Sequence, residues 1–355
     1  MKPNINPKIS IILPCQNEEQ ALDFCLNEIK QTIKKNRLSA EIIVSDSSTD
    51  NSPKIALRHA QGKPKITEII LIKHDKDGYG SAYLEAFKKA KGKYIFMADA
   101  DATYEFNQIP VFISHLENGY DIVIGNRFGG KIEKNAMPLL NRYIGNPFLS
   151  FVFRVLFNAK IKDTQSGMRA FGKQTFEKLR LKTTGMEFAS EMLIKAIKNN
   201  LKIKEIPVNY RKRKGVSKLK PYSDAWKHLR FMLLYSPLFL FFLPGLLLFL
   251  AGIFFIALGS NSLLSPFLFI SGYQLIIFSI FAKTYSITHL KERSYLMEKL
   301  YKYITIEKAI LAGSVVFLAG FLFTKNPIIM FSLMTMGVQT VFSSFMLSIL
   351  GIKEK

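Results

Sequence analysis

The sequence predicts an α/β domain with a doubly wound, mostly parallel sheet, followed by an amphipathic helix and an all-α transmembrane region. Strand-like and helix-like segments alternate at short spacing between residues 8 and 207, which is typical of a parallel sheet with helices on both faces. Polar and apolar residues are mixed before Phe231, whereas long stretches after Ser236 carry almost no charge. We therefore expect an α/β domain at 1–220, an amphipathic helix at 221–235 and a transmembrane region at 236–355.

The elements of the first domain follow from the hydrophobic pattern. Short apolar runs such as "KISIIL" predict strands that a parallel sheet buries on both faces. The expected strands lie at 8–13, 41–44, 68–72, 94–98, 121–124 and 203–207. The expected helices lie at 18–35, 52–59, 79–90, 106–117 and 188–198.

The next segment, at 221–235, combines apolar and basic residues. Trp226, Met232 and two leucines are interspersed with Lys227, His228 and Arg230. This pattern is typical of a helix lying in the membrane interface, with Trp226 at headgroup depth. The alternative is an ordinary amphipathic helix packed on the α/β domain.

Four later segments are apolar enough to predict membrane spans: 236–259, 263–282, 308–323 and 327–350, of which 308–323 is the shortest. The connection between the second and third spans is rich in Lys and Arg, whereas the connection between the first and second is uncharged. The positive-inside rule then places the α/β domain on the cytoplasmic side of a cell membrane or an ER-type membrane.

The charge balance limits the class of partner. There are 49 basic and 27 acidic residues, which leave a formal net charge of +22. This excess favours an anionic partner: a phosphorylated substrate, an acidic lipid surface or nucleic acid. Nucleic acid is disfavoured because no aromatic platform or helix-turn-helix pattern accompanies the charge. Cys15 and Cys25 have neither a pairing pattern nor metal-ligand spacing, so we expect a reducing, cytosolic setting.

The strongest functional signal is Asp99-Ala100-Asp101, directly after the apolar run that ends at Ala98. Open α/β sheets bind ligands at the carboxyl ends of their strands. Two carboxylates there can share one hard divalent cation with substrate phosphates. The alternative is that an aspartate caps the helix expected from Phe106.

Three segments together resemble glycosyltransferase family 2. In "ISIILPCQNEE", Pro14, Asn17 and Glu18 fall on that family's nucleotide-facing turn, and in "EIIVSDSSTDNS", Asp46 falls where an acid contacts the base or ribose. "MADADATYEF" supplies the acid-x-acid element. The resemblance implies a GT-A-type fold. The sequence departs from the family at Ser45 and Ser47, where Asp and Gly are more usual, and at Thr103, where related enzymes carry a Gln that assists the metal.

Further segments resemble the polyprenyl-phosphate branch, the dolichol-phosphate mannose and glucose synthase-like enzymes. They include "YDIVIGNRFGG", "MPLLNRYIGNP", "DTQSGMRAF" and "TTGMEFASEML", in that family's order. The resemblance implies inverting transfer of a hexose from UDP-glucose or GDP-mannose to a polyprenyl phosphate such as dolichyl or undecaprenyl phosphate. Transfer to another lipid or glycan, and a non-catalytic nucleotide-sugar-binding membrane component, are the alternatives. A homo-oligomer is compatible with the leading function and with both alternatives.

The resemblance, together with the chemistry of the side chains, assigns candidate roles. The metal ligands for Mg²⁺ or Mn²⁺ are Asp99 and Asp101. The catalytic candidates are Asp101, Asp163, Arg127 and Arg142. The donor-binding candidates are Pro14, Asn17, Glu18, Asp46, Gly78, Asp99, Asp101 and Glu191. The candidates for the acceptor phosphate are Arg142, Asn146, Arg169, Arg211, Arg213, Ser217 and Lys218. Alternatives remain for two of them: a surface ion pair for Arg127, and for Glu191 an ion pair with Lys195 one helical turn away.

Overall fold

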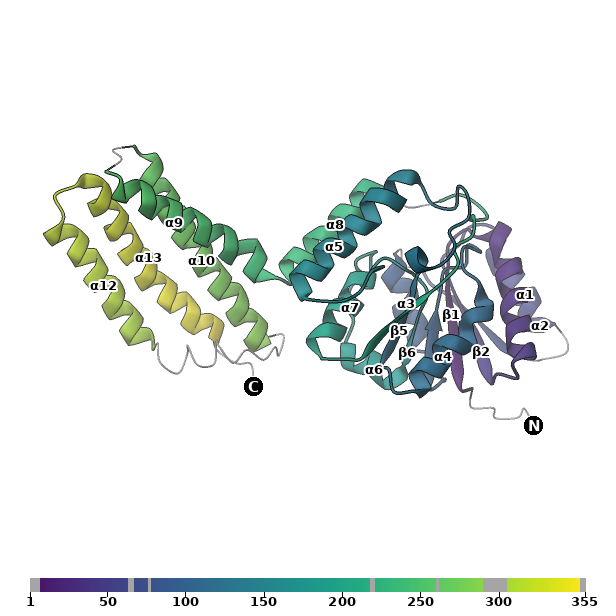
Figure 1. The fold of residues 1–355 in the computed structure, drawn as a ribbon. Helices are drawn as coiled ribbons and strands as arrows, with labels where there is room; N and C mark the ends of the chain where they lie inside the picture. Colours follow the sequence, from purple (N-terminus) through teal and green to yellow (C-terminus); the bar gives the residue numbers. More distant parts are fainter. Residues whose placement is uncertain are drawn as a thin grey trace. The chain divides into compact units, whose positions relative to one another are not determined.

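A computed structural model describes residues 7–62, 67–75, 78–217, 221–259, 262–289 and 305–351 (Figure 1). The chain divides into two compact units, Met1–Met232 and Leu233–Lys355. The boundary lies close to residue 236, where the sequence pattern changes. Each unit is described separately below.

The first unit is built on a seven-stranded sheet in the order β3-β2-β1-β4-β6-β5-β7. Its strands are β1 (Ile9–Cys15), β2 (Ala40–Asp46), β3 (Glu68–Lys73), β4 (Tyr94–Met97), β5 (Ile122–Asn126), β6 (Arg169–Gly172) and β7 (Ile203–Pro207). All neighbouring pairs are parallel except those of β6, which runs antiparallel to both β4 and β5. The expected mostly parallel sheet is confirmed, and β6 is an additional strand that the hydrophobic pattern did not predict.

Helices cover both faces of this sheet. The helices of the first unit are α1 (Glu19–Lys35), α2 (Ser52–Gln61), α3 (Tyr79–Phe87), α4 (Ile109–Glu117), α5 (Asn146–Phe157), α6 (Lys173–Leu179), α7 (Phe188–Lys198) and α8 (Pro221–Leu234). On one face, α1, α2 and α4 pack against alternate strand residues such as Ile11 and Phe96. On the other, Tyr83 of α3 stacks on Phe188 of α7, with 5.7 Å between ring centroids. Burial on both faces explains why the strands are continuous apolar runs.

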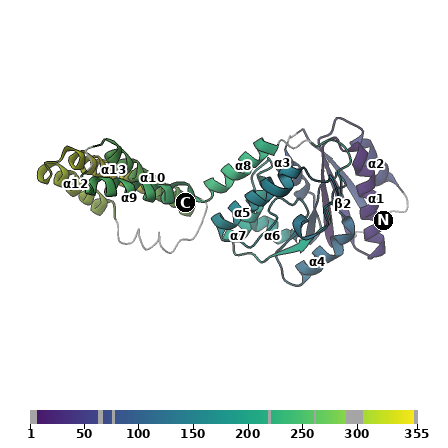
Figure 2. The ribbon, with the colours of Figure 1, turned by 45° about the horizontal axis from the view of Figure 1, so that its top comes forward.

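Helices α5 and α8 lie side by side in both ribbon views (Figures 1 and 2). The inner side of α8 packs on the domain, since Met232 is fully buried and His228 Nδ1 lies 2.8 Å from the Ser190 hydroxyl. His228 was expected among the basic residues of the polar side, and the structure corrects this. Trp226 remains 59% exposed on α8. The helix therefore packs on the domain through one side and exposes its tryptophan on another.

The second unit is helical. It contains a π-helical turn (η4, Leu238–Phe242) and the helices α9 (Leu243–Ala257), α10 (Leu264–His289), α12 (Ile306–Phe323) and α13 (Pro327–Gly351). Among the described helices, three are long and apolar enough to cross a membrane: Leu238–Ala257, Leu264–Thr288 and Pro327–Gly351. The expected third span forms the shorter helix α12, which is not one of these three, so a fourth crossing stays a prediction. Within the unit, the Tyr273 hydroxyl of α10 lies 2.6 Å from the Thr340 hydroxyl of α13.

Candidate active site

Asp99 and Asp101 follow β4 at the carboxyl edge of the sheet. They do not cap a helix: the 3-10 turn η1 (Phe106–Gln108) has no side-chain cap, and the Phe106 amide donates instead to Glu28. The capping alternative is therefore wrong. Between Asp101 and Thr103, Ala102 adopts a left-handed backbone conformation with φ of 64°. Such strain in a residue other than glycine or asparagine is typical of functional sites.

The two oxygens of Asp101 have different partners. Thr103 donates to Oδ1 from its amide, at 3.1 Å, and from its hydroxyl, at 2.5 Å. Oδ2 lies 3.1 Å from Arg213 Nη1, and Arg213 Nη2 also donates to Glu18 Oε1. Thr103 therefore orients the carboxylate, and Arg213 joins two predicted donor-binding acids, Glu18 and Asp101.

Asp99 lies in a more enclosed place. A β-carbon added to Gly167 would lie 2.5 Å from Asp99 Oδ2, so the backbone of the 165–168 loop closes directly over this carboxylate. Burial, and then repulsion from Asp101, raise the pKa of Asp99 well above its usual range. Two adjacent, partly desolvated carboxylates disfavour each other's charge, and a divalent cation would relieve this repulsion. The donor set consists of hard oxygens, which suits Mg²⁺ or Mn²⁺.

The described residues contain no group of three or more His, Cys, Asp or Glu side chains that could hold a metal ion. Asp99 and Asp101 supply only two carboxylates. A cation here would therefore need additional oxygen ligands from a bound substrate or from water, as is common for magnesium at phosphate sites.

Residues 209–217, called the strap below, run alongside the acid-x-acid loop. The Arg211 amide donates to the Thr103 carbonyl at 2.8 Å, and the Lys214 amide donates to the Asp101 carbonyl at 3.1 Å. The Arg211 side chain forms two hydrogen bonds to Glu28 and lies 3.3 Å from Glu105. Arg211 thus holds the strap against α1, an arrangement that does not favour its expected role at the acceptor phosphate.

The predicted nucleotide-facing turn borders an open hollow of about 470 Å³, lined by 17–20, 49–50 and 215–216. Asn17 shapes this turn, since its side-chain oxygen accepts hydrogen bonds from the Thr49 and Asp50 amides. Pro14 and Asp46 lie at the adjacent ends of β1 and β2. Asp46 is 2% exposed, and its Oδ1 has no hydrogen-bond partner among the described residues. A buried carboxylate oxygen in this state is suited to accept a hydrogen bond from a ligand.

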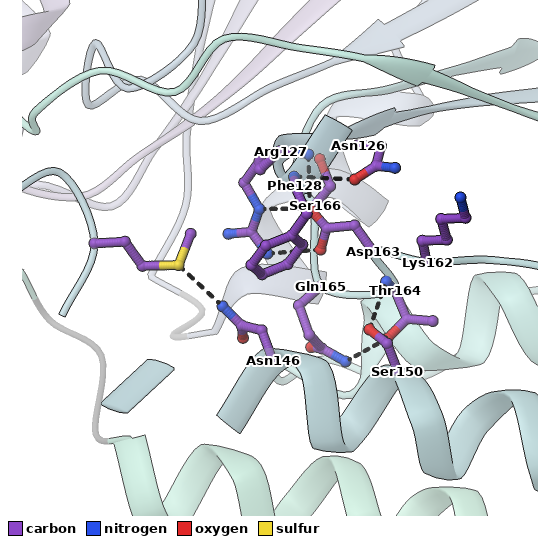
Figure 3. Close-up of polar contacts among 12 residues, drawn as sticks. Asn126, Arg127, Phe128, Asn146, Ser150, Lys162, Asp163, Thr164, Gln165 and Ser166 are labelled. Carbon is purple, nitrogen blue, oxygen red and sulfur yellow. Dashed lines mark hydrogen bonds and ion pairs between the residues drawn. The ribbon is translucent and has the colours of Figure 1, made fainter. Parts of the chain in front are cut away.

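Arg127 and Asp163 form a buried ion pair with two contacts (Figure 3). Arg127 Nε lies 2.7 Å from Asp163 Oδ2, and Nη2 lies 2.8 Å from Oδ1. The Arg127 amide donates to the same carboxylate at 3.0 Å. The alternative interpretation of Arg127 as part of a surface ion pair is wrong, because the ion pair lies in the interior. Asp163 is 0% exposed, so its direct role is to position Arg127.

Arg142 and Asn146, four residues apart, lie in the π-helical turn η3 (Asn141–Gly145) and at the start of α5. The Arg142 guanidinium lies over the Tyr143 ring, 5.4 Å from its centroid. Asn146, drawn with the Arg127–Asp163 pair in Figure 3, donates to the Met137 sulfur at 3.4 Å. Ser217 ends the described part of the strap, and Lys218 lies outside the described residues.

Three predicted site residues support the fold instead. Arg169 is 0% exposed and donates to the carbonyls of Ser166, Ala189 and Thr164, so it does not fit the expected acceptor role. Glu191 accepts hydrogen bonds from the Lys182 and Thr183 amides and pairs with Lys195 at 2.6 Å, as its alternative interpretation proposed. Gly78 has φ of 117°, and a β-carbon there would lie 2.4 Å from the Thr184 carbonyl oxygen, so glycine is needed for this close approach.

Sequence reasoning missed three residues of the site: Gly167, Tyr104 and Tyr210. The two tyrosine rings are in edge contact, with 5.4 Å between centroids, and the Arg127 guanidinium lies 5.3 Å from the Tyr210 ring centroid. The Tyr104 hydroxyl accepts a hydrogen bond from the Gly167 amide at 2.8 Å. The matched "DATYEF" and "DTQSGMRAF" segments contained two of these residues, and only the fold brings them together.

The chain is similar to several known proteins. Residues 10–180 match the family model "Glycosyl transferase family 2". The chain is 33% identical over 380 residues to the low-salt glycan biosynthesis hexosyltransferase Agl6 of Haloferax volcanii, covering 98% of this chain and 90% of that protein. It is 31% identical over 218 residues to the dolichyl-phosphate hexose transferase of the same organism, covering 61% of this chain and 89% of that protein.

A solved structure shares the fold. Mannosyl-3-phosphoglycerate synthase from Rubrobacter xylanophilus superposes with a TM-score of 0.51 at 15% identity, over 64% of this chain and 73% of that one. At this identity the likeness establishes the fold alone.

Proposed function

The chain belongs to glycosyl transferase family 2, in its polyprenyl-phosphate branch, and we propose that it moves a hexose from a nucleotide sugar to a membrane polyprenyl phosphate. UDP-glucose and GDP-mannose are the proposed donors. The observation that carries the proposal is the position of Asp99 and Asp101 at the carboxyl edge of the sheet, where burial and repulsion from Asp101 raise the pKa of Asp99 even though the charges of Arg213 and Arg127 oppose the shift.

Asp99 and Asp101 are the proposed ligands of Mg²⁺ or Mn²⁺. When bound, the cation would neutralise charge on the donor diphosphate as the glycosidic bond breaks. Asn17 and Glu18 line the hollow in which we place the nucleotide, and Asp46 lies at the end of strand β2. The Asp46 oxygen that lacks a partner in the described part of the chain is proposed to accept a hydrogen bond from the base or ribose.

Arg127 is a further proposed phosphate contact. Asp163 fixes the guanidinium by two contacts, which use Nε and Nη2 and not Nη1. Because the guanidinium is held in one orientation, little entropy is lost when it binds a phosphate. Arg142 and Asn146 are proposed to bind the acceptor phosphate.

The acceptor needs positioning more than activation. A phosphate monoester is largely dianionic at neutral pH, since its second pKa is about 6, so a general base is not required. In-line attack on the anomeric carbon of an α-linked donor would give a β-linked product. Side chains of this protein then have to screen the repulsion between the acceptor phosphate and the donor diphosphate. Arginine side chains are suited to this role.

An exposed apolar row supports a lipid acceptor. Along η3 and α5, the side chains of Tyr143, Ile144, Phe148, Phe151 and Val155 are 66%, 61%, 52%, 54% and 47% exposed. Their spacing of three to four residues places most of them on one side of the helix. Such a surface suits the apolar boundary of a bilayer, with Arg142 at the level of lipid phosphates. We propose that this row and Trp226 of the adjacent α8 face the cytoplasmic leaflet.

The test is an acceptor panel. Purified protein is incubated with radiolabelled UDP-glucose or GDP-mannose and with polyprenyl phosphate, diacylglycerol or no acceptor in mixed micelles. The proposal expects label in polyprenyl phosphate only, released by mild acid as expected for a sugar phosphodiester. Label in diacylglycerol alone would support the lipid-transferase alternative. Donor binding by calorimetry without transfer to any acceptor would support a non-catalytic component.

A further inference from the structure

Arg213 lies beside the proposed metal ligand Asp101. Its guanidinium contacts Asp101 Oδ2 at 3.1 Å and also donates to Glu18 Oε1, while the arginine side chain is 21% exposed. We propose that Arg213 is a built-in counter-cation, which a divalent metal must displace from Asp101. This inference rests on the proposed function, since it assumes that Asp101 is a metal ligand.

The two Asp101 oxygens differ in their freedom to bind a cation. Oδ1 is fixed by the amide and hydroxyl of Thr103. Oδ2 is therefore the oxygen that can turn to a metal, and it is the one that Arg213 contacts. A metal ion and a guanidinium repel each other and compete for the same lone pairs. Metal coordination at Oδ2 thus requires Arg213 to withdraw.

Arg213 can withdraw without leaving the site. The strap is held beside the acid-x-acid loop by the Arg211 amide and the Lys214 amide, on either side of Arg213, and neither bond involves the Arg213 side chain. Glu18 remains as a second carboxylate for the displaced guanidinium. Arg213 Nε is buried and has no hydrogen-bond partner within the described residues. The displaced side chain thus keeps one charge partner and carries a donor able to meet an incoming anion.

The consequence is a coupling between metal and nucleotide. When the metal binds alone, Arg213 loses its contact with Asp101 and gains no new anionic partner. With a nucleoside diphosphate present, the added negative charge attracts the displaced guanidinium. Arg213 would therefore weaken binding of the metal alone and strengthen binding of the metal together with the nucleotide. A structural arginine that only fastens the strap would have no such pair of opposite effects.

The experiment measures Mn²⁺ binding to the full-length protein in detergent from the electron paramagnetic resonance signal of free Mn²⁺, first without nucleotide and then with UDP or GDP. We expect Arg213→Gln to bind Mn²⁺ alone about 3- to 10-fold more tightly than wild type, the size of one part-buried charge contact. The enhancement of Mn²⁺ binding by UDP or GDP should fall by a similar factor. Arg213→Met, which keeps an apolar stem, serves as a second variant if Arg213→Gln does not fold.

Arg211→Gln is the matched control, because Arg211 lies on the same strap but pairs with Glu28 and Glu105 instead of Asp101. It should leave the affinity for Mn²⁺ alone unchanged. Equal or weaker Mn²⁺ binding by folded Arg213 variants would overturn the inference, as would equal tightening by Arg211→Gln. If wild type binds no Mn²⁺ even with UDP and GDP, the metal site of the proposed function fails as well. If only the Arg213 effect is missing, the proposed function stands.

Discussion

Arg127 and Asp163, which are 36 residues apart, form an internal ion pair in which both carboxylate oxygens are used. Their side chains are only 8% and 0% exposed. Tyr210 and Phe128 also lie near the guanidinium, with ring centroids 5.3 Å and 6.0 Å away. Asp163 therefore acts by holding Arg127, and it supports both stability and the position of a proposed phosphate contact.

Replacing Asp163 should destabilise the protein. Asp163→Ala leaves a buried guanidinium without its charge partner, which costs about 3–5 kcal/mol in the free energy of unfolding. Chemical denaturation followed by circular dichroism measures the change. Glu117→Ala, which removes the exposed partner of Lys8, is the control and should cost less than about 1 kcal/mol. Equal, small costs for both variants would show that the internal pair does not support the fold.

Replacing Glu191 distinguishes a structural role of this residue from a contact with the donor sugar. It holds the Lys182 and Thr183 amides, whose loop caps the start of α3 through the Thr184 carbonyl. We expect Glu191→Ala to lower the free energy of unfolding by about 2–3 kcal/mol, because buried donors lose their acceptor. Glu187→Ala, on the same loop, is the control. Unchanged stability of Glu191→Ala with a raised KM for the donor would instead support the sugar contact.

His228 should make the docking of α8 depend on pH. Burial lowers the pKa of His228 to about 4, whereas the exposed side chain titrates near 6.5. Between these values the undocked state binds more protons, so docking is fully stable above about pH 6.5 and weakens by up to about 3 kcal/mol as the pH falls toward 4. Fluorescence of Trp226, the single tryptophan, reports the change. His228→Gln should remove this transition, and an identical transition in that variant would exclude His228 as its source.

The exposed row on α5 should affect the lipid substrate alone. Phe148→Ser combined with Phe151→Ser removes two large apolar side chains, which we expect to raise the KM for polyprenyl phosphate about 10-fold or more. The KM for the donor should not change. Val111→Ser, at a 47% exposed position of α4, is the control and should alter neither value. An unchanged KM for the lipid in the double variant would show that this row does not meet the acceptor or its bilayer.

The regular part of the fold could be predicted because its periodicity is local. Strands β1 and β2 each contain consecutive apolar residues, at 11–13 and 42–44, and α1 repeats apolar residues at helical spacing. Strand β6 could not be predicted in this way. It has only four residues, begins with the internal Arg169, and lies between β4 and β5, antiparallel to both.

The residues of the site could be predicted from the sequence better than the contacts between them. The position of Asp99 and Asp101 follows from the end of a buried strand, which sequence alone shows. Arg213, in contrast, is 195 residues from Glu18, and no local pattern indicates that they pair. Similarly, the matched motif singles out Arg169, but it does not indicate that the Arg169 side chain points into the interior. Charge type was predictable, whereas the direction of a side chain depends on the tertiary fold.

The most direct test of the central claim compares wild type with Asp101→Asn for transfer of labelled hexose to polyprenyl phosphate, in EDTA and after addition of Mg²⁺ or Mn²⁺. We expect wild type to lose transfer in EDTA and to regain it with either cation. Asp101→Asn should stay at least about 1,000-fold slower at every metal concentration, since several kcal/mol of charge stabilisation are lost. Full transfer by wild type in EDTA, or by Asp101→Asn, would contradict the claim that these carboxylates hold a cation against the donor.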